Sequence, residues 1–308
     1  MKNVFIRKII PIMLVIAALT GTIPCAFAVS DLSSTPDSVS EYDVVTDELN
    51  DDWFNILLLG TDVRDESGYG RTDSMILLSV NLATKEAKLT SFMRDLWVSI
   101  PGHKGKAKLN AACVYGGPEL LMKTLNELFG LNIKDYALVN LSGMADIIDM
   151  LGGLRLDVSE SERKALNKGL FDLSSKSGME ELRKSGEQVL LNGNQAVAFA
   201  RIRQIDSDYQ RTERQREVLT ALAKRLQDEN GTSLLSLVPT LLKYVETNMA
   251  ITELMTLAYI GLQMDMDNIQ QYRIPVDNTY ESGTYDGVWC IKADLKKNAK
   301  LLKKFIYG

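Results

Sequence analysis

Short apolar runs bounded by glycine and turn residues recur along the chain from Trp53 onward. Such runs predict buried strands, whereas apolar positions three or four residues apart predict helices. The predicted strands are 54–59, 75–80, 87–92, 136–139 and 154–158, and the predicted helices are 118–129 and 143–151. Because strands alternate with helices, the pattern predicts an α/β fold.

The first three predicted strands follow one another closely, which indicates an up-down-up meander. In a meander the end of the first strand, the start of the second and the end of the third lie at one edge. Asp62, Asp73 and Arg94 occupy these three positions, so we expect them to converge. Two carboxylates beside an arginine can hold a divalent cation together with an anionic ligand. The alternative is an ordinary loop with surface ion pairs.

The segment 201–217 contains five arginines and no lysine. A guanidinium group can contact two phosphate oxygens at a fixed geometry, which an ammonium group cannot do. Arg211, Arg214 and Gln215 are spaced to share one side of a helix. Arg201 and Arg203 would share a face if the apolar segment before them is extended. The pattern therefore favours a polyphosphate site.

A solvated helix is the alternative interpretation of this segment. In it, Arg211, Arg214 and Arg216 would form ion pairs with Glu213 and Glu217 on the same helix. That interpretation leaves the two arginines at the start of the segment unexplained. A second basic loop, with Lys104, Lys106 and Lys108 around His103, is typical of a solvated surface.

Composition removes several classes of site. One histidine among 308 residues excludes sites with several imidazoles, and three cysteines exclude a four-thiolate zinc site. The chemistry must therefore rest on carboxylates, arginines and hydroxyls. Cys113 and Cys290 are predicted to be buried free thiols, because their spacing does not require a disulfide. From Trp53 onward, basic and acidic residues are equal in number, so no broad basic surface for nucleic acid is expected.

The amino terminus has the pattern of an export signal. Lys2, Arg7 and Lys8 precede the apolar run 9–19, and Ala26-Phe27-Ala28 fits a cleavage site. We therefore expect 1–28 to be a signal peptide or a membrane anchor, 29–52 an acidic flexible linker, and 53–308 one catalytic domain. The protein would then be extracytoplasmic, near the membrane if anchored and secreted if the signal is cleaved.

Ten short motifs occur in a fixed order between residues 53 and 225. They are Asn55-Ile-Leu-Leu-Leu-Gly-Thr-Asp62, Gly70-Arg-Thr-Asp73-Ser-Met, Arg94-Asp95, Ile100-Pro-Gly, Lys108-Leu-Asn110-Ala-Ala, Tyr115-Gly-Gly, Leu151-Gly-Gly, Leu191-Asn-Gly-Asn-Gln-Ala196, Phe199-Ala-Arg201-Ile-Arg203 and Asp208-Tyr-Gln-Arg211-Thr-Glu-Arg214-Gln215. In this order they resemble the LytR-CpsA-Psr family of cell-envelope proteins. The resemblance implies a three-layer α/β/α sandwich around a mixed central β-sheet.

The resemblance also implies an activity. Members of the family transfer a glycopolymer, such as teichoic acid or capsule, from an undecaprenyl-pyrophosphate carrier to peptidoglycan, with Mg²⁺ at the pyrophosphate. The implied residues are Asp62 and Asp73 for the metal, and Arg94, Arg201, Arg203, Arg211 and Gln215 for the pyrophosphate. Asp73, Arg94, Arg203 and Asp208 are the implied catalytic residues. One of the two aspartates would accept the proton of the attacking hydroxyl.

Two other functions agree with the same residues. A hydrolase of the lipid pyrophosphate would release free polymer, and a non-catalytic or regulatory protein would only bind the lipid-linked glycan. The family's old label of transcriptional attenuator suggests the regulatory role. Any of these functions needs an apolar groove for the isoprenoid, and the candidate segments are 234–262 and the helix face of Met144, Ile147 and Ile148.

Overall fold

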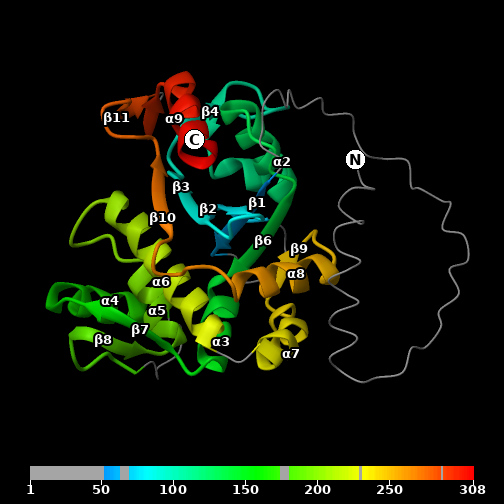
Figure 1. Cartoon of the computed structure of the whole chain (residues 1–308). Helices are drawn as coiled ribbons and strands as arrows, with labels where there is room; N and C mark the ends of the chain where they lie inside the picture. The colour runs from blue at the N-terminus through cyan, green and yellow to red at the C-terminus, as the bar shows by residue number, and fades with distance from the viewer. Residues whose placement is uncertain (1–51, 63–68, 174–179, 229–230, 286) are drawn as a thin grey trace, which may run out of the picture. The chain divides into compact units, whose positions relative to one another are not determined.

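The computed structural model describes residues 52–62, 69–173, 180–228, 231–285 and 287–308 (Figure 1). These residues all belong to one compact unit. The predicted leader and nearly all of the predicted linker lie outside the described residues, so both remain predictions. Within the described ranges, no helix combines the length and apolarity needed to span a membrane.

A six-stranded mixed sheet forms the centre of the fold, in the order β10-β3-β2-β1-β6-β9. The first three strands form the predicted antiparallel meander, and β6 and β10 run parallel to their neighbours β1 and β3. The strands are β1 (Trp53–Thr61), β2 (Thr72–Asn81), β3 (Ala87–Phe92), β6 (Asp135–Asn140), β9 (Val245–Thr247) and β10 (Gln270–Ile274). The mixed sheet that the family resemblance implies is confirmed.

Helices cover both faces of this sheet (Figure 1). On one face, α2 (Ala111–Phe129) and α9 (Leu295–Tyr307) pack against the alternate strand positions that include Leu57 and Leu77. On the other face, α8 (Ile251–Gly261) contributes Ile260 to a cluster with Val80. The remaining helices are α3 (Leu141–Met150), α4 (Glu160–Leu173), α5 (Gly193–Ala200), α6 (Asp208–Asp228) and α7 (Gly231–Leu241). The three-layer α/β/α arrangement is therefore confirmed.

Three two-stranded antiparallel sheets complete the described part. They are β4 (Trp97–Ser99) with β5 (Lys106–Lys108), β7 (Leu154–Val158) with β8 (Gly186–Leu191), and β11 (Tyr280–Tyr285) with β12 (Val288–Ala293). Helix α4 connects β7 to β8, and this sheet shares a second apolar core with α3, α4 and α5. This core fixes the position where α5 ends and α6 begins.

Two predicted elements differ from the structure. Helix α2 begins at Ala111, earlier than the predicted helix 118–129. It consists of two segments separated by a kink at Gly116 and Gly117, and only the second segment matches the prediction. The sequence pattern predicts that Arg201 and Arg203 share a face if the segment before them is extended. The structure instead places that segment in α5. Asn192 and Gln195 start that helix with a reciprocal capping box, whose two side chains satisfy each other's backbone N–H groups. Cys113 and Cys290 are buried thiols that form no disulfide within the described residues, as predicted.

Candidate functional site

The ends of three strands converge as the meander predicted. Thr61 at the end of β1 is paired with Thr72 at the start of β2, and Asp73 follows directly. Arg94 lies two residues beyond the end of β3, and its Nη1 donates to Asp73 Oδ1 over 2.7 Å. The predicted convergence of Asp73 and Arg94 is therefore confirmed.

The connection after α5 and the first turn of α6 bring three more charged residues to this pair. Arg203 Nη2 lies 3.3 Å from Asp73 Oδ2, and Arg211 Nη2 donates to Asp208 Oδ2 over 2.9 Å. Asp208 also lies 3.8 Å from Arg94 Nε and 3.9 Å from Arg203 Nε. We call these five residues, Asp73, Arg94, Arg203, Asp208 and Arg211, the arginine cluster.

The arginine cluster carries an excess of positive charge, because three guanidinium groups share two carboxylates. The Arg211 side chain is only 2% exposed. The Nε atoms of Arg94 and Arg211 are buried and make no hydrogen bond with any residue that the structure describes. A buried donor without a partner costs free energy, and such donors in a native site commonly belong to an absent water or ion. The cluster is therefore suited to bind an anion.

Electrostatics explains the ionisation of the cluster. Burial raises the pKa of Asp73, but the charge and hydrogen bond of Arg94, with Arg211 and Arg203, outweigh burial and leave the pKa below 3.8. Burial lowers the pKa of Arg211 to about 10, aided by its cationic neighbours and opposed by Asp208. Both groups are charged at neutral pH, so the excess positive charge is present there.

Three predicted site residues lie outside the cluster contacts. Asp62 and Arg201 are exposed and Gln215 is half-buried. In the described part of the chain, no hydrogen bond or ion pair joins any of them to the cluster. Arg201 follows the last residue of α5 as its C-cap. Their predicted roles in metal and pyrophosphate binding stay predictions.

Two other arginines of the segment serve the fold. Arg214 Nε donates to Glu162 Oε1 over 2.8 Å, and its terminal nitrogens pair with Asp206. Arg216 donates from Nε to Gln271 and from Nη1 to Ser91. Arg211, Arg214 and Gln215 lie on one helix, as their spacing predicts, but the partners of Arg214 assign it to the fold rather than to the arginine cluster.

The solvated-helix alternative is wrong, because the acids that pair with Arg211 and Arg214 are not Glu213 and Glu217. Arg211 pairs with Asp208, one turn before it, and Arg214 pairs with Asp206 and with Glu162 on α4. Neither arginine has an ion pair with Glu213 or Glu217 within the described residues.

A lysine beside the cluster was missed. Lys108 Nζ donates to Asp95 Oδ1 over 2.5 Å, and Arg94 Nε lies 3.5 Å from Asp95 Oδ2. Lys108 was grouped with two neighbouring lysines as a solvated loop, although it belongs to a motif of its own. The signal that could have found it is that both Asp95 and Lys108 lie inside the ordered motifs.

The chemistry of the donors tests whether Mg²⁺ fits. Among the described residues, no group of three His, Cys, Asp or Glu side chains is close enough to hold a metal. Mg²⁺ needs only one or two carboxylates when phosphate oxygens and water complete its shell. The Asp62 carboxylate is exposed. Both oxygens of Asp73 contact arginines, and the longer of the two contacts is to the half-exposed Arg203. Binding of Mg²⁺ by Asp62 and Asp73 together with a phosphate ligand therefore stays a prediction.

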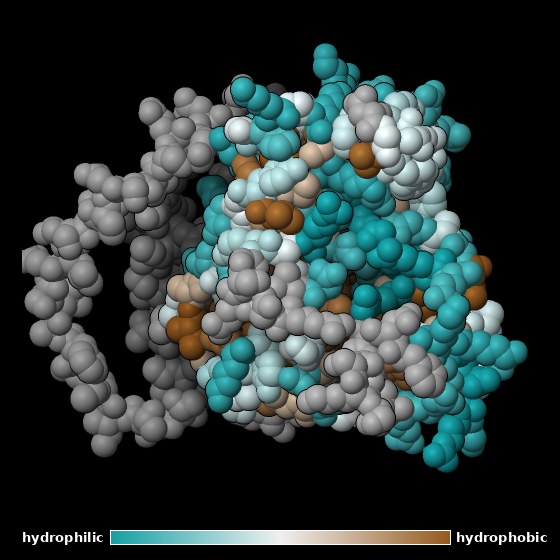
Figure 2. All heavy atoms as spheres, turned by 180° about the vertical axis from the view of Figure 1, so that it is seen from behind, coloured by the Kyte–Doolittle hydropathy of each residue, from teal (hydrophilic) through white to brown (hydrophobic). Residues whose placement is uncertain are grey.

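The candidate apolar segments differ in exposure. Ile147 and Ile148 are buried in the interior, so they belong to the core. On α8, Ile251, Met255 and Tyr259 are exposed at a spacing of four residues. Figure 2 shows hydrophobic side chains gathered on the side where Figure 1 places α7 and α8. The segment 234–262 thus presents apolar surface.

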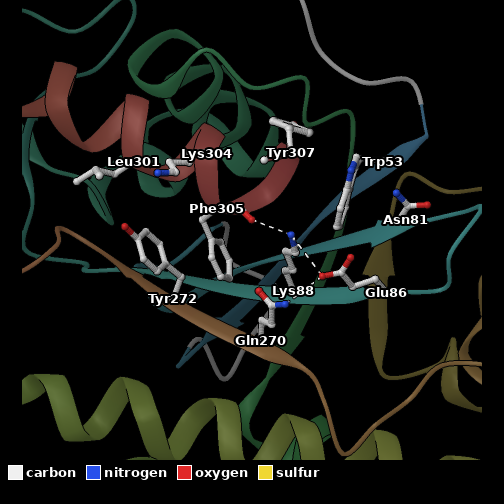
Figure 3. Close-up of a pocket in the computed structure, with 11 residues that line it drawn as sticks. Trp53, Asn81, Glu86, Lys88, Gln270, Tyr272, Leu301, Lys304, Phe305 and Tyr307 are labelled. Atoms are coloured by element: carbon white, nitrogen blue, oxygen red, sulfur yellow. Dashed lines mark hydrogen bonds and ion pairs between the residues drawn. The ribbon is translucent and has the colours of Figure 1, made fainter.

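A cavity of about 640 Å³ lies at the opposite end of β3 from the arginine cluster (Figure 3). Trp53 stands on one side of it, and Tyr272 and Phe305 stand on the other. Lys88 lies between them and donates to the backbone oxygens of Phe305 and Ile306 at the end of α9. Because β3 separates Lys88 from Arg94, this cavity is not part of the cluster.

Comparisons with known proteins give one consistent result. Residues 27–304 match the model of the LytR_cpsA_psr family. The chain is 31% identical over 263 residues to regulatory protein MsrR of Staphylococcus aureus (strain COL), which covers 83% of this chain and 75% of that protein. It is 37% identical over 196 residues to polyisoprenyl-teichoic acid–peptidoglycan teichoic acid transferase TagU of Oceanobacillus iheyensis, covering 61% of this chain and 55% of that protein.

A solved structure gives the same result. The fold is similar to that of the LytR-CPS2A-psr family protein YwtF (TagT) with bound octaprenyl pyrophosphate lipid. The TM-score is 0.62 and the sequence identity 25%, and the alignment covers 87% of this chain and 94% of that one.

Proposed function

Because the chain belongs to the LytR_cpsA_psr family, we propose that it transfers a glycopolymer from a polyprenyl-pyrophosphate carrier to peptidoglycan. The observation that carries the proposal is the arginine cluster, with its excess positive charge and with buried Nε donors of Arg94 and Arg211 that make no hydrogen bond within the described residues. The names of TagU and of the lipid-bound YwtF structure support the same substrate class. The polymer is of the teichoic-acid type or another envelope glycan such as capsule.

The reaction is a phosphoryl transfer. A hydroxyl of a peptidoglycan sugar attacks the phosphorus that bears the glycan, and the bond from that phosphorus to the oxygen of polyprenyl phosphate breaks. Polyprenyl phosphate leaves with the bonding electrons. Arg94, Arg203 and Arg211 offer donors to the phosphate oxygens, where charge is redistributed in the transition state. Positioning and electrostatic stabilisation supply most of the acceleration in reactions of this kind.

The two aspartates of the cluster receive different roles in this proposal. Asp73 is a poor proton acceptor, because its pKa lies below 3.8, and it orients Arg94 and Arg203. Asp208 uses Oδ2 to accept from Arg211, while its Oδ1 is 3.9 Å from Arg203 Nε. We assign Asp208 Oδ1 as the acceptor of the proton that the attacking hydroxyl loses.

Mg²⁺ is the proposed cofactor, and Asp62 and Asp73 are the residues that would hold it together with pyrophosphate oxygens. When bound, the ion would neutralise charge on those oxygens. Arg201 and Gln215 are proposed to contact more distant parts of the same ligand. The leader pattern of 1–28 supports a location outside the cytoplasmic membrane and near it, which agrees with a membrane-borne donor and a peptidoglycan acceptor.

A reconstituted assay tests the function. Full-length protein is mixed with a labelled polyprenyl-pyrophosphate glycan and peptidoglycan oligomers, with Mg²⁺ present or chelated. Label joined covalently to peptidoglycan is the expected product, and its formation should stop under chelation. Free polymer as the product would indicate hydrolysis instead, and binding without turnover would indicate a regulatory protein. Undiminished transfer under chelation would contradict the Mg²⁺ proposal alone.

The matched variants for this assay are Arg211→Ala and Arg183→Ala. Arg183 is exposed and distant in sequence from the cluster, and its side chain is 85% accessible. We expect transfer to be lost in the first variant and unchanged in the second. Equal activity in both variants would contradict the assignment of the cluster as the reaction site.

A further inference from the structure

The β11–β12 hairpin is attached to the chain segment that carries Arg94. Ile291 on β12 donates its backbone N–H to the oxygen of Asp95 over 2.9 Å, and the same strand bridges to Leu96. The Ile291 side chain is buried in the main apolar core. The hairpin is thus held in a fixed position beside the arginine cluster.

Trp289 lies two residues before Ile291, so both side chains leave the same face of the strand. The Ile291 side chain is buried, but Trp289 is 48% exposed. The Lys108 ammonium lies 5.9 Å from the centroid of the Trp289 ring. The same ammonium donates a hydrogen bond to the Asp95 carboxylate, whose Oδ2 lies 3.5 Å from Arg94 Nε. A short series of contacts therefore joins the exposed ring to the cluster.

Rigid placement and exposure together favour a binding role for this ring. The other two tryptophans are more covered: Trp53 is buried and Trp97 is half-buried. A large aromatic side chain that stays half in solvent on an anchored strand offers broad contact area without a further loss of conformational freedom. The Lys108 ammonium near the ring disfavours a wholly apolar partner at this position.

Both molecules that meet at the scissile phosphorus carry sugars. Pyranose rings present an apolar face of C–H groups, which packs on aromatic rings, and a rim of hydroxyls, which accept from groups such as an ammonium. Lys108 donates one hydrogen bond to Asp95 and has further N–H groups to offer. Trp289 and Lys108 therefore present the two kinds of contact that a sugar ring needs, next to the phosphate position.

We propose that Trp289, with the Lys108 ammonium over one side of its ring, is a saccharide-binding subsite whose other side stacks on a sugar ring near the reacting phosphate. This inference rests on the proposed function, and it concerns recognition rather than the chemical step. The sugar belongs either to the glycan of the donor or to the peptidoglycan acceptor, and the experiment separates these sources.

The test compares Trp289→Ala, Trp289→Phe and the control Val288→Ala, which truncates the exposed neighbour of Trp289 whose side chain leaves the other face of β12. Initial rates are measured while the donor and the acceptor are varied separately. We expect the alanine variant to raise the KM for one of them by about tenfold with kcat little changed, as loss of one stacked ring would do. Phenylalanine should restore most of the affinity, and the control should match the parent protein.

The substrate whose KM rises identifies the source of the sugar. Polyprenyl pyrophosphate without a glycan serves as a further probe. The Trp289→Ala variant should bind this lipid with the same affinity as the parent protein. Unchanged KM values for both substrates, while Arg203→Ala abolishes transfer, would overturn the subsite and leave the proposed function intact. Failure of Arg203→Ala to affect transfer would instead contradict the proposed function.

A direct measurement removes dependence on turnover. A phosphate-free peptidoglycan disaccharide and a phosphate-free repeat of the glycan are titrated separately, and tryptophan fluorescence is followed. A saturable change should occur with one saccharide in the parent protein and be absent in Trp289→Phe. Saturable changes of equal size in both proteins, or none in the parent, would overturn the proposal. The thermal unfolding midpoint of each variant confirms that the fold is intact.

Discussion

Arg211 and Arg214 lie one turn apart on α6 and are both buried, yet their surroundings differ. Arg214 contacts two carboxylates, those of Glu162 and Asp206, and also the backbone oxygen of Ile202. Arg211 hydrogen-bonds one carboxylate, that of Asp208, which two further arginines approach. Its Nε makes no hydrogen bond in the described part of the chain.

The pKa values follow this difference. Burial lowers the pKa of both guanidinium groups, but the hydrogen bonds and charges of Asp206 and Glu162 reverse the direction for Arg214, whose pKa is raised. For Arg211 the lowering remains, because Arg94 and Arg203 add to it. The comparison teaches that the arginine whose donors are met by two carboxylates belongs to the fold, whereas the one with a buried Nε that lacks a hydrogen bond within the described residues is available to a ligand.

The largest expected effect is on turnover. Arg203→Ala should lower kcat by about 10² to 10³, because it removes one positioned donor from the phosphate oxygens. Arg203 is 44% exposed, so the unfolding midpoint should change little. Single-turnover transfer with saturating donor measures the effect. A loss of less than about tenfold would place Arg203 outside the reaction site.

The second expected effect is on stability. Arg214→Ala should lower the free energy of unfolding by about 3 kcal/mol, because it leaves two partly buried carboxylates without their cation. Activity per folded molecule should be unchanged, which is the reverse of the result expected for Arg203. Urea unfolding gives the stability, and Arg183→Ala serves as the control. A stable but inactive Arg214→Ala protein would remove the distinction between the two regions.

The third prediction concerns pH. The pKa of Asp73 in the folded protein lies below 3.8, its ordinary value, so its ion pairs stabilise the fold above that pH and are lost as pH falls through the folded pKa. Asp73→Asn should therefore be less stable than the parent by about 2 kcal/mol at neutral pH. The difference should shrink in acid below pH 3.8. A difference that is constant from neutral to acid pH would contradict the ion-pair assignment.

The smallest expected effect is at Glu213. This residue is exposed and has no ion pair with Arg211 or Arg214 in the described part of the chain. Glu213→Gln should change stability by less than about 0.5 kcal/mol and leave transfer unaltered. Urea unfolding and the transfer assay measure both, and a clear loss in either would revive the solvated-helix interpretation.

The sequence was sufficient for the part of the site that depends on local order. Three strands joined by short connections predicted that Asp73 and Arg94 would meet, and the hydrogen bond between them confirms it. The partner of Arg214 could not be predicted, because Glu162 lies on another helix and is brought near only by the second core. For the same reason, spacing on α6 could not separate Arg211 from Arg214.

Two further differences have physical causes. The segment before Arg201 is helical because a capping box at Asn192 and Gln195 starts the helix. The short apolar run that follows is compatible with a strand as well as a helix, so the run alone did not predict the helix. Trp289 lies far along the chain from the motifs that form the cluster. Its position beside Lys108 depends on the parallel bridge between Leu96 and Ile291, and no local sequence pattern predicts that bridge.

The order of strands in the central sheet has a consequence for biogenesis. Both edges of that sheet, β9 and β10, come from the last quarter of the polypeptide, while the four inner strands come from its first half. Until synthesis is nearly complete, the inner strands have uncovered edges whose amides can pair with another chain. Pairings between such distant segments also form slowly. A ribosome-bound or truncated chain that ends before β10 should therefore aggregate readily, and a protease or chaperone would meet it in that state.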